Sequence, residues 1–246
     1  MQVAEIVPVS CLDMIADRKY HMCLAQLVLK NKEYANFYRR MADEGKYVVL
    51  DNGAAEGESL SFEDLYKAYE LIEPSEIILP DEMRNGERSF IKSLDFYLQY
   101  KDKIENIMVV PQGKDWTQWK KYARYILELF ESEFFGDNKL TIGVPKWLGS
   151  DDAGNRLAIC QWLNSFSVNI HLLGCSEGPE IMNLCSRSNY KVRGCDSAFA
   201  YIAAKEKIDH IDKNTRRPNG HIDFLNDSKI DNLSTLMSDF EKVVLA

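Results

Sequence analysis

Three aspartates that each close an apolar segment are the residues best suited to do chemistry in this sequence. Asp51 ends YVVLD, Asp81 follows EIILP, and Asp196 ends VRGCD. A single aspartate in this position is most often the N-cap of the next helix. Several carboxylates in one place repel one another, however, and are usually retained for a ligand. They suit attack on an anomeric carbon or recognition of the N–H edge of a purine-like base, and a base-exchanging N-glycoside transferase needs both.

Amide and glycine residues stand at the ends of other apolar segments. Asn52 adjoins Asp51, Gln112 follows NIMVVP, Gly143 lies in LTIGV, and Gly174 ends VNIHLLG. An amide can both donate and accept hydrogen bonds to a base. A glycine lets the backbone approach a substrate closely, although a plain turn explains these glycines equally well. We expect these four residues to complete a pocket for a base.

Other familiar catalytic patterns are absent from the sequence. It contains no HExxH, Walker or GxGxxG motif, and its four histidines are dispersed. His171 lies inside an apolar segment and is expected to be a buried core histidine. The six cysteines show no zinc-ligand spacing, which predicts packing residues in a reducing compartment and no metal site. A hydrolase that uses the three acids as metal ligands stays open as an alternative.

Eight short apolar segments alternate with helical patterns from end to end, which is typical of a parallel sheet covered on both faces. We predict one α/β domain over residues 1–246, a (β/α)8 TIM barrel, with residues 205–246 forming a C-terminal loop and closing helix. An open doubly wound sheet fits the same alternation. The expected strands are 4–9, 22–29, 47–51, 76–80, 106–111, 140–144, 168–174 and 192–196.

Residues that favour helix ends support this division of the chain into strands and helices. Ser61 stands before FEDLYKAYELI with Asp64 at capping-box distance, and Asp115 precedes a second long amphipathic pattern. Gly45 follows a third, YANFYRRMADE. These signals predict helices that begin after residues 61 and 115 and one that ends before residue 45.

Charge is distributed unevenly along the chain. The 246 residues are 46% hydrophobic and 28% charged, with a formal charge of −8, so any contact with nucleic acid must come from a local basic surface. Residues 187–217 hold eight Lys and Arg against four acids, whereas residues 43–82 hold twelve acids against two lysines. Two solvated surfaces would explain this asymmetry equally well. No signal peptide or membrane span is apparent, and we expect a cytoplasmic protein.

Six motifs at successive segment ends resemble the tRNA-guanine transglycosylase superfamily. They are VVLDNGA, ILPDE, VVPQG, TIGVPKW, HLLGCSEGPE and RGCDS, and the resemblance covers roughly residues 22–197. It is greatest to the short phage-type members associated with placing 7-deazaguanine bases in DNA. The resemblance implies an eight-stranded barrel that replaces guanine in a polynucleotide with a free base such as preQ0 or preQ1, through a covalent glycosyl-enzyme intermediate.

The resemblance also implies roles for individual residues. Asp196 would be the nucleophile on C1′ of the sugar, and Asp51 would assist proton transfer to the departing or entering base. Asp81 would recognise the base edge, with the pocket residues named above. The phosphates on either side would be bound by basic residues near the nucleophile in sequence, namely Arg187, Lys191, Arg193, Arg216 and Arg217.

The sequence also departs from the family. The C-terminal CxCxxC cluster and histidine of the tRNA enzymes have no counterpart after Cys195, so no zinc or other cofactor is expected. Ala54 and Ala55 stand where the family has a base-stacking aromatic residue, and we expect the segment after residue 29, Phe199 or Tyr201 to supply stacking instead. The expected partner is DNA, with a helper protein possible. The same chemistry on tRNA and a non-catalytic barrel that binds nucleic acid or another protein are the alternatives.

Overall fold

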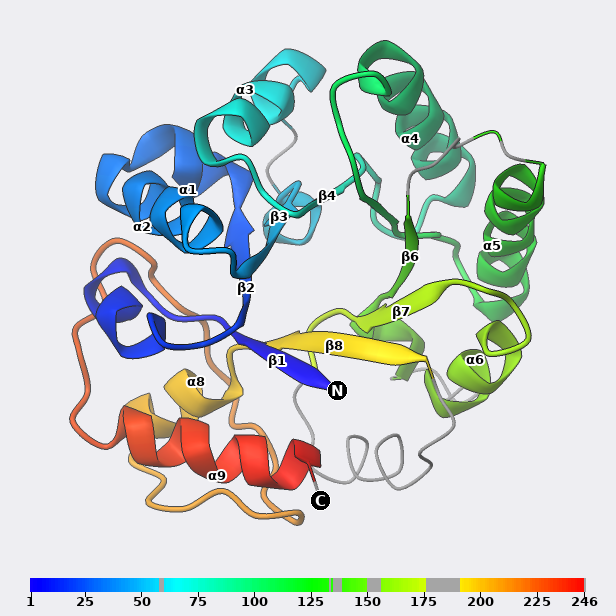
Figure 1. The fold of residues 1–246 in the computed structure, drawn as a ribbon. Helices are drawn as coiled ribbons and strands as arrows, with labels where there is room; N and C mark the ends of the chain where they lie inside the picture. The colour runs from blue at the N-terminus through cyan, green and yellow to red at the C-terminus, as the bar shows by residue number, and fades with distance from the viewer. Residues whose placement is uncertain (58–59, 133, 135–138, 150–155, 176–190, 246) are drawn as a thin grey trace.

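The computed structural model describes residues 1–57, 60–132, 134, 139–149, 156–175 and 191–245. Eight strands form one parallel sheet in the order β1-β8-β7-β6-β5-β4-β3-β2, and the sheet curls into a barrel with helices around it (Figure 1). The (β/α)8 barrel predicted from the sequence is confirmed, and the open sheet is wrong. The strands are β1 (Gln2–Glu5), β2 (Tyr20–Leu24), β3 (Tyr47–Asp51), β4 (Glu76–Ile78), β5 (Ile107–Val109), β6 (Leu140–Val144), β7 (Asn169–Leu172) and β8 (Val192–Ser197).

Helices fill most of the connections between these strands. Ser61 and Asp115 cap their helices as predicted, because their side chains accept hydrogen bonds from the backbone N–H groups of Asp64 and Gln118. The described helices are α1 (Ala25–Lys30), α2 (Lys32–Asp43), α3 (Phe62–Ile72), α4 (Gly86–Tyr100), α5 (Trp116–Glu131), α6 (Arg156–Leu163), α8 (Phe199–Lys205) and α9 (Leu233–Leu245).

Two predicted strands have the wrong bounds. The segment expected as a strand over 4–9 pairs only through Glu5 and continues as a 3-10 helix from Val9 to Ile15. The segment expected over 22–29 leaves the sheet at Leu24 and becomes α1. A continuous apolar run has no period that separates a buried strand from a buried helix, and residues 25–28 are buried in the helix.

The barrel closes at a seam between β1 and β2. These two strands lie next to each other but stand at opposite ends of the strand order, with no hydrogen-bonded ladder between them. Beside the seam, Ala4 of β1 is in register with Asp196 of β8, and Leu24 of β2 is in register with Asp51 of β3. Two of the three predicted acids therefore stand on strands one removed from the seam, on opposite sides of it.

The C-terminal extension closes against the outside of the barrel. α9 packs on α8 and reaches β1 (Figure 1), and the rings of Phe199 and Phe240 meet edge to face at 5.4 Å. The closing helix predicted after residue 205 is confirmed. None of the helices in the described part of the chain combines the length and apolar composition needed to cross a bilayer.

A buried carboxyl group lies beneath this extension. Glu5 is only 4% exposed, and its Oε1 atom has no hydrogen-bond partner among the described residues. Burial raises its pKa from 4.5 to about 8, although the nearby charge of Arg18 opposes the shift. Arg18 itself bonds Glu241 of α9 at 2.5 Å.

We expect the free energy of unfolding to fall as pH rises from about 4.5 through about 8, because the folded state holds a proton on Glu5 that the unfolded state releases. The loss should reach a few kcal/mol, since each pKa unit is worth about 1.4 kcal/mol. Glu5→Gln should remove this dependence, whereas Glu33→Gln at an exposed position of α2 should leave it unchanged. Urea unfolding across this pH range measures the effect, and an equal slope in wild type and Glu5→Gln would contradict it.

Candidate active site

The three aspartates line one cavity at the carboxyl ends of the strands. Asp51 ends β3, Asp81 follows β4 and Asp196 lies near the end of β8. The cavity has a volume of about 460 Å³, within the roughly 300–1,000 Å³ typical of small-molecule sites. This is also the end of a parallel barrel at which active sites are built.

Asp196 is held by hydrogen-bond donors on both carboxylate oxygens. The backbone N–H of Gly174 donates to Oδ1 at 3.0 Å and to Oδ2 at 3.1 Å, and Nε2 of His171 lies 3.2 Å from Oδ1. Gly174 has φ of 63°, a conformation that favours glycine and aims its N–H at the carboxylate. These donors hold the carboxylate in one orientation. The Asp196 side chain remains 15% exposed, so it can reach a ligand.

Asp51 lies in a contrasting environment. Burial raises its pKa well above the ordinary aspartate value, and the negative charges of Glu56, Asp196 and Asp81 raise it further. The N–H of Gly53, which donates to Oδ1 at 3.1 Å, opposes these effects. The cavity therefore contains one aspartate whose oxygens both face hydrogen-bond donors and another whose pKa is raised by burial, and two carboxyl groups in different environments can take different roles.

Asp81 is fixed by two side-chain amides. Asn52 donates to Oδ1 at 2.9 Å and Gln112 donates to Oδ2 at 2.6 Å. Burial raises the pKa of Asp81, while these two hydrogen bonds lower it. Each carboxylate oxygen keeps acceptor capacity for a ligand.

Both predicted amides line the cavity, and their contact with a base stays a prediction. Asn52 also donates to the carbonyl of Leu79 at 2.7 Å, so both of its N–H groups are engaged. Oε1 of Gln112 accepts from Nε1 of Trp147 at 3.1 Å and from the backbone N–H of Arg84 at 3.2 Å. The amides therefore hold Asp81 in place, because most of their hydrogen-bonding capacity is used within the protein.

Gly143 has a packing role instead of the predicted backbone contact with a base. A Cβ at this position would stand 2.8 Å from Val110 and 3.2 Å from Leu173. Both of those side chains line the cavity, whereas Gly143 is not part of its lining. Because Gly143 has no side chain, Val110 and Leu173 can pack closely against the backbone in the cavity wall.

The sequence prediction missed the apolar wall of the cavity. Trp147, Met83 and Leu173 line the same cavity as the acids, and the guanidinium of Arg84 lies 4.2 Å from the centre of the Trp147 ring. The motif TIGVPKW contains this tryptophan, which was the available signal. The expectation that Phe199 or Tyr201 stacks on a base is wrong, because both are buried in α8 with exposures of 0% and 1%.

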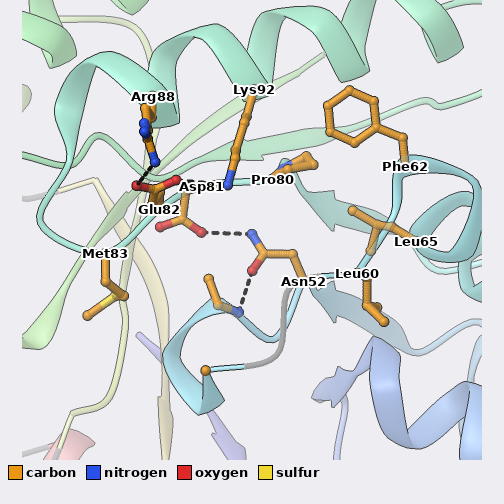
Figure 2. Close-up of a pocket in the computed structure, with 12 residues that line it drawn as sticks. Asn52, Leu60, Phe62, Leu65, Pro80, Asp81, Glu82, Met83, Arg88 and Lys92 are labelled. Atoms are coloured by element: carbon orange, nitrogen blue, oxygen red, sulfur yellow. Dashed lines mark hydrogen bonds and ion pairs between the residues drawn. The ribbon is translucent and has the colours of Figure 1, made fainter.

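Two further cavities adjoin the first. One, of about 440 Å³, shares Asn52 and Asp81 and is bordered by Glu82, which pairs with Arg88 and Lys92 (Figure 2). The other, of about 330 Å³, shares Asp51 and Asp196 and is bordered by residues of the C-terminal extension, among them Arg217 and His221. The three acids therefore lie where the partly apolar cavity that they share meets two adjoining cavities lined in part by basic residues.

The predicted phosphate-binding residues do not form one surface. Arg217 lines the smaller cavity, Arg216 is exposed in the same segment, and Arg187 lies outside the described residues. Lys191 and Arg193 stand at the start of β8, whereas Asp196 stands near its end. The prediction that these two bind phosphate beside the nucleophile is wrong, since they lie toward the opposite end of the barrel.

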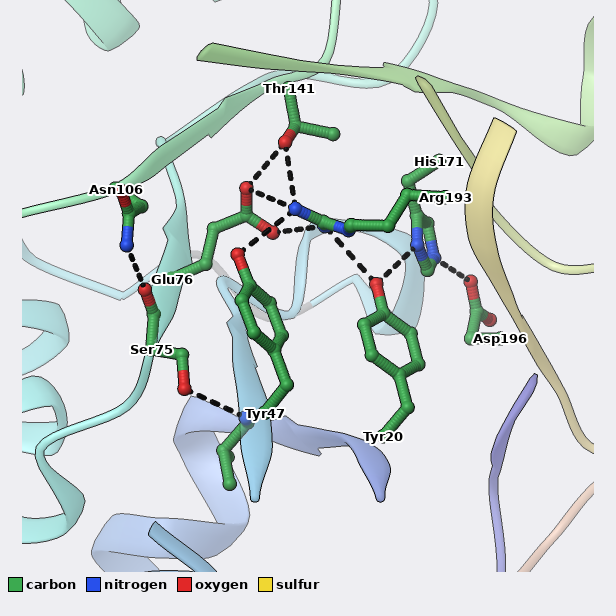
Figure 3. Close-up of polar contacts among 10 residues, drawn as sticks. Tyr20, Tyr47, Ser75, Glu76, Asn106, Thr141, His171, Arg193 and Asp196 are labelled. Atoms are coloured by element: carbon green, nitrogen blue, oxygen red, sulfur yellow. Dashed lines mark hydrogen bonds and ion pairs between the residues drawn. The ribbon is translucent and has the colours of Figure 1, made fainter. Parts of the chain in front are cut away.

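Arg193 points into the barrel, where it pairs with Glu76 (Figure 3). The Glu76 side chain is fully buried, and the guanidinium also donates to the hydroxyl groups of Tyr47 at 2.9 Å and Tyr20 at 3.1 Å. The positive charge of Arg193 therefore balances the buried carboxylate of Glu76 inside the barrel.

We expect Arg193→Met to lower the free energy of unfolding by about 3–5 kcal/mol, because it leaves Glu76 buried without a counter-charge. Lys191→Met, two residues away at an exposed position, is the matched control and should change stability little. Urea denaturation at neutral pH measures both. Unchanged stability with a weaker salt dependence of DNA binding would restore Arg193 as a phosphate contact.

Among the described residues, no group of three or more His, Cys, Asp and Glu side chains is arranged to hold a metal ion. The three acids of the cavity are satisfied by amide, backbone and imidazole donors instead.

Comparison with known proteins places the chain in a class of fold. It is similar to a D-psicose 3-epimerase from Clostridium cellulolyticum H10, solved with D-tagatose, with a TM-score of 0.52 over 100% of this chain and 99% of that one. The protein is a TIM barrel. At 10% identity the likeness concerns the fold alone. No family model matches the sequence, and no curated protein matches it.

Proposed function

We propose that this protein is a base-exchanging transglycosylase that replaces guanine in DNA with a 7-deazaguanine of the preQ0 or preQ1 type. The proposal depends on one observation above all, the contrast between Asp196 and Asp51 in a single cavity. Asp196 faces His171 and the backbone N–H of Gly174, whereas burial raises the pKa of Asp51 well above its ordinary value. Two of the motifs that resemble the tRNA-guanine transglycosylases, VVLDNGA and RGCDS, contain these same acids.

Each acid has a distinct task in the proposed first half-reaction. A carboxylate oxygen of Asp196 attacks C1′ of the sugar, and the bond from C1′ to the guanine nitrogen breaks with its electron pair passing to the base. The carboxyl group of Asp51 gives its proton to the departing base. The products are a glycosyl ester on Asp196, neutral guanine and an ionised Asp51.

The second half-reaction reverses these steps with a different base. The Asp51 carboxylate takes the N–H proton of the entering 7-deazaguanine, whose nitrogen attacks C1′ and releases Asp196 as a carboxylate. No oxidant, reductant or metal enters this scheme. Because the ester conserves the energy of the glycosidic bond, exchange needs no separate activation step.

The cavity offers suitable partners for a flat heterocycle. Trp147, Met83 and Leu173 supply apolar area, and Asp81 supplies acceptors for the N–H donors of a guanine-like ring. The adjoining cavity with Arg217 could receive the sugar and its phosphate. Since a stacked base cannot reach such a site, the substrate must be single-stranded or flipped out of the duplex.

A base-exchange assay tests the proposal. Single-stranded and duplex DNA, and separately tRNA, are incubated with the protein and radiolabelled preQ0 or preQ1, and the nucleosides are analysed after digestion. We expect label in DNA, with Asp209→Asn, an exposed acid of the C-terminal extension, as a variant of unchanged activity. Label in tRNA alone would reject DNA as the substrate, and label in neither would reject the transglycosylase.

A further inference from the structure

A chain of hydrogen bonds runs through the barrel from the predicted nucleophile to a buried ion pair (Figure 3). Nε2 of His171 lies 3.2 Å from Oδ1 of Asp196, and its Nδ1 lies 2.8 Å from the hydroxyl of Tyr20. That hydroxyl lies 3.1 Å from Nη2 of Arg193, which pairs with Glu76. The His171 ring is fully buried.

The direction of every bond in this chain is fixed from the Arg193 end. An arginine has only donors, so the Tyr20 oxygen must accept from Arg193. Among the described residues, Nδ1 of His171 is the other neighbour within hydrogen-bond distance of this hydroxyl, so the Tyr20 hydrogen is satisfied when Nδ1 is unprotonated and accepts it. The hydrogen of a neutral imidazole therefore stands on Nε2, facing the carboxylate.

The charged groups around the imidazole agree with this arrangement. The Asp196 carboxylate faces Nε2 from β8, and the opposite side faces Tyr20 of β2, whose ring stacks on that of Tyr47 at 5.6 Å. Beyond Tyr20 lie the paired charges of Arg193 and Glu76. A second proton on Nδ1 would leave the Tyr20 hydrogen directed at another donor in a buried place, at the cost of an unsatisfied polar group.

The donors are also shared unequally between the two oxygens of Asp196. Within the described part of the chain, Oδ1 faces both His171 and Gly174, whereas Oδ2 faces Gly174 alone. Oδ2 therefore keeps more free acceptor capacity than Oδ1.

We propose that His171 is a positioning residue for the transglycosylase reaction: locked as the Nε2–H tautomer by Tyr20 and Arg193, it holds Oδ1 of Asp196 and leaves Oδ2 as the atom that attacks C1′. This inference rests on the proposed function for the identity of the reaction. The locked imidazole itself follows from the hydrogen-bond geometry alone. Orientation by a third group is a general feature of activated nucleophiles.

Nitrogen NMR of the imidazoles tests the lock without any assay of activity. Protein labelled with ¹⁵N-histidine is observed from pH 6 to 9, and the His171 signals are assigned by their loss in His171→Phe. At the alkaline end of the range we expect protonated Nε2 and unprotonated Nδ1 in the wild type. Tyr20→Phe, which removes the hydroxyl with little change in volume, should allow the Nδ1–H tautomer. An Nδ1–H tautomer or an imidazolium in the wild type at that end of the range would overturn the inference.

Exchange kinetics test the effect on Asp196. We expect His171→Phe to lower kcat by roughly 10- to 100-fold, the scale found for groups that orient a reacting residue, with KM for the free base little changed. His171→Gln should recover most of this loss, because its amide can place an N–H donor near the position of Nε2. His21→Phe removes a buried imidazole whose one side-chain hydrogen bond among the described residues is with the carbonyl of Arg18, outside the hydrogen-bond chain that ends at Asp196, and should match wild type. Urea unfolding shows whether each variant is folded. If His171→Phe is not folded, Tyr20→Phe is assayed in its place.

The two experiments separate the inference from the proposed function. An Nε2–H imidazole in a wild-type protein that exchanges no base would reject the transglycosylase and with it the role of His171 in exchange. An active wild type in which folded His171→Phe keeps its kcat would reject the positioning role and retain the transglycosylase.

Discussion

The Asp196→Asn protein is expected to exchange bases at least about 10⁴-fold more slowly than wild type, the scale of loss when a covalent nucleophile is removed. An amide cannot form the glycosyl ester. In the wild type both oxygens of Asp196 face N–H donors. The NH₂ group of an asparagine at this position would therefore face the N–H of Gly174 or of the imidazole, donor against donor.

The covalent intermediate gives this prediction a direct measurement. Wild-type protein incubated with single-stranded DNA and no free 7-deazaguanine should form a protein–DNA adduct that survives denaturation and is located at Asp196 by mass spectrometry. Asp196→Asn should form none, while Asp209→Asn should form the wild-type amount. An adduct of equal yield in Asp196→Asn would assign the nucleophile to another residue.

Replacement of Asp51 by Asn should slow exchange by about 10²–10⁴-fold, the usual contribution of a general acid or base. Because burial raises the pKa of Asp51, its carboxyl group can donate a proton to guanine in the first half-reaction. Adduct formation by the wild type should therefore fall as pH rises through that raised pKa. In Asp51→Asn this alkaline decline should disappear.

A substrate that needs no acid distinguishes this role from a loss of binding. N7-methylguanine carries a positive charge and leaves as a neutral base without protonation, so adduct formation from it should be nearly as fast in Asp51→Asn as in wild type. Asp51→Asn that is equally slow on guanine and N7-methylguanine would contradict the role of proton donor. The adduct is quantified on denaturing gels in both cases.

The strand pattern was sufficient to predict where the three acids meet. Asp51, Asp81 and Asp196 follow short β-branched segments, and the carboxyl ends of parallel strands come together at one end of a barrel. The helix starts after Ser61 and Asp115 were predictable for a similar reason, because capping depends on residues only three apart in the chain.

Other features depend on contacts that no local pattern contains. The roles of Asn52 and Gln112 follow from where their amide hydrogens point, and both point at Asp81 from other strands. Arg193 was misassigned because its distance from Asp196 in sequence is short, whereas a strand carries the two toward opposite ends of the barrel. His171 was expected to be a core histidine, and it is one, but its contact with Asp196 depends on the pairing of β7 with β8.

The seam between β1 and β2, which no ladder of backbone hydrogen bonds bridges, affects the two acids that we propose react. Asp196 belongs to the strand on one side of that join and Asp51 to the strand on the other, each one strand away. Across the rest of the wall, spacing is set by rigid backbone hydrogen bonds, but here it is set by side-chain packing. The separation between the proposed nucleophile and the proposed proton donor therefore spans a join without backbone hydrogen bonds, which would suit the proposed exchange of a base attached to a polymer for a free one.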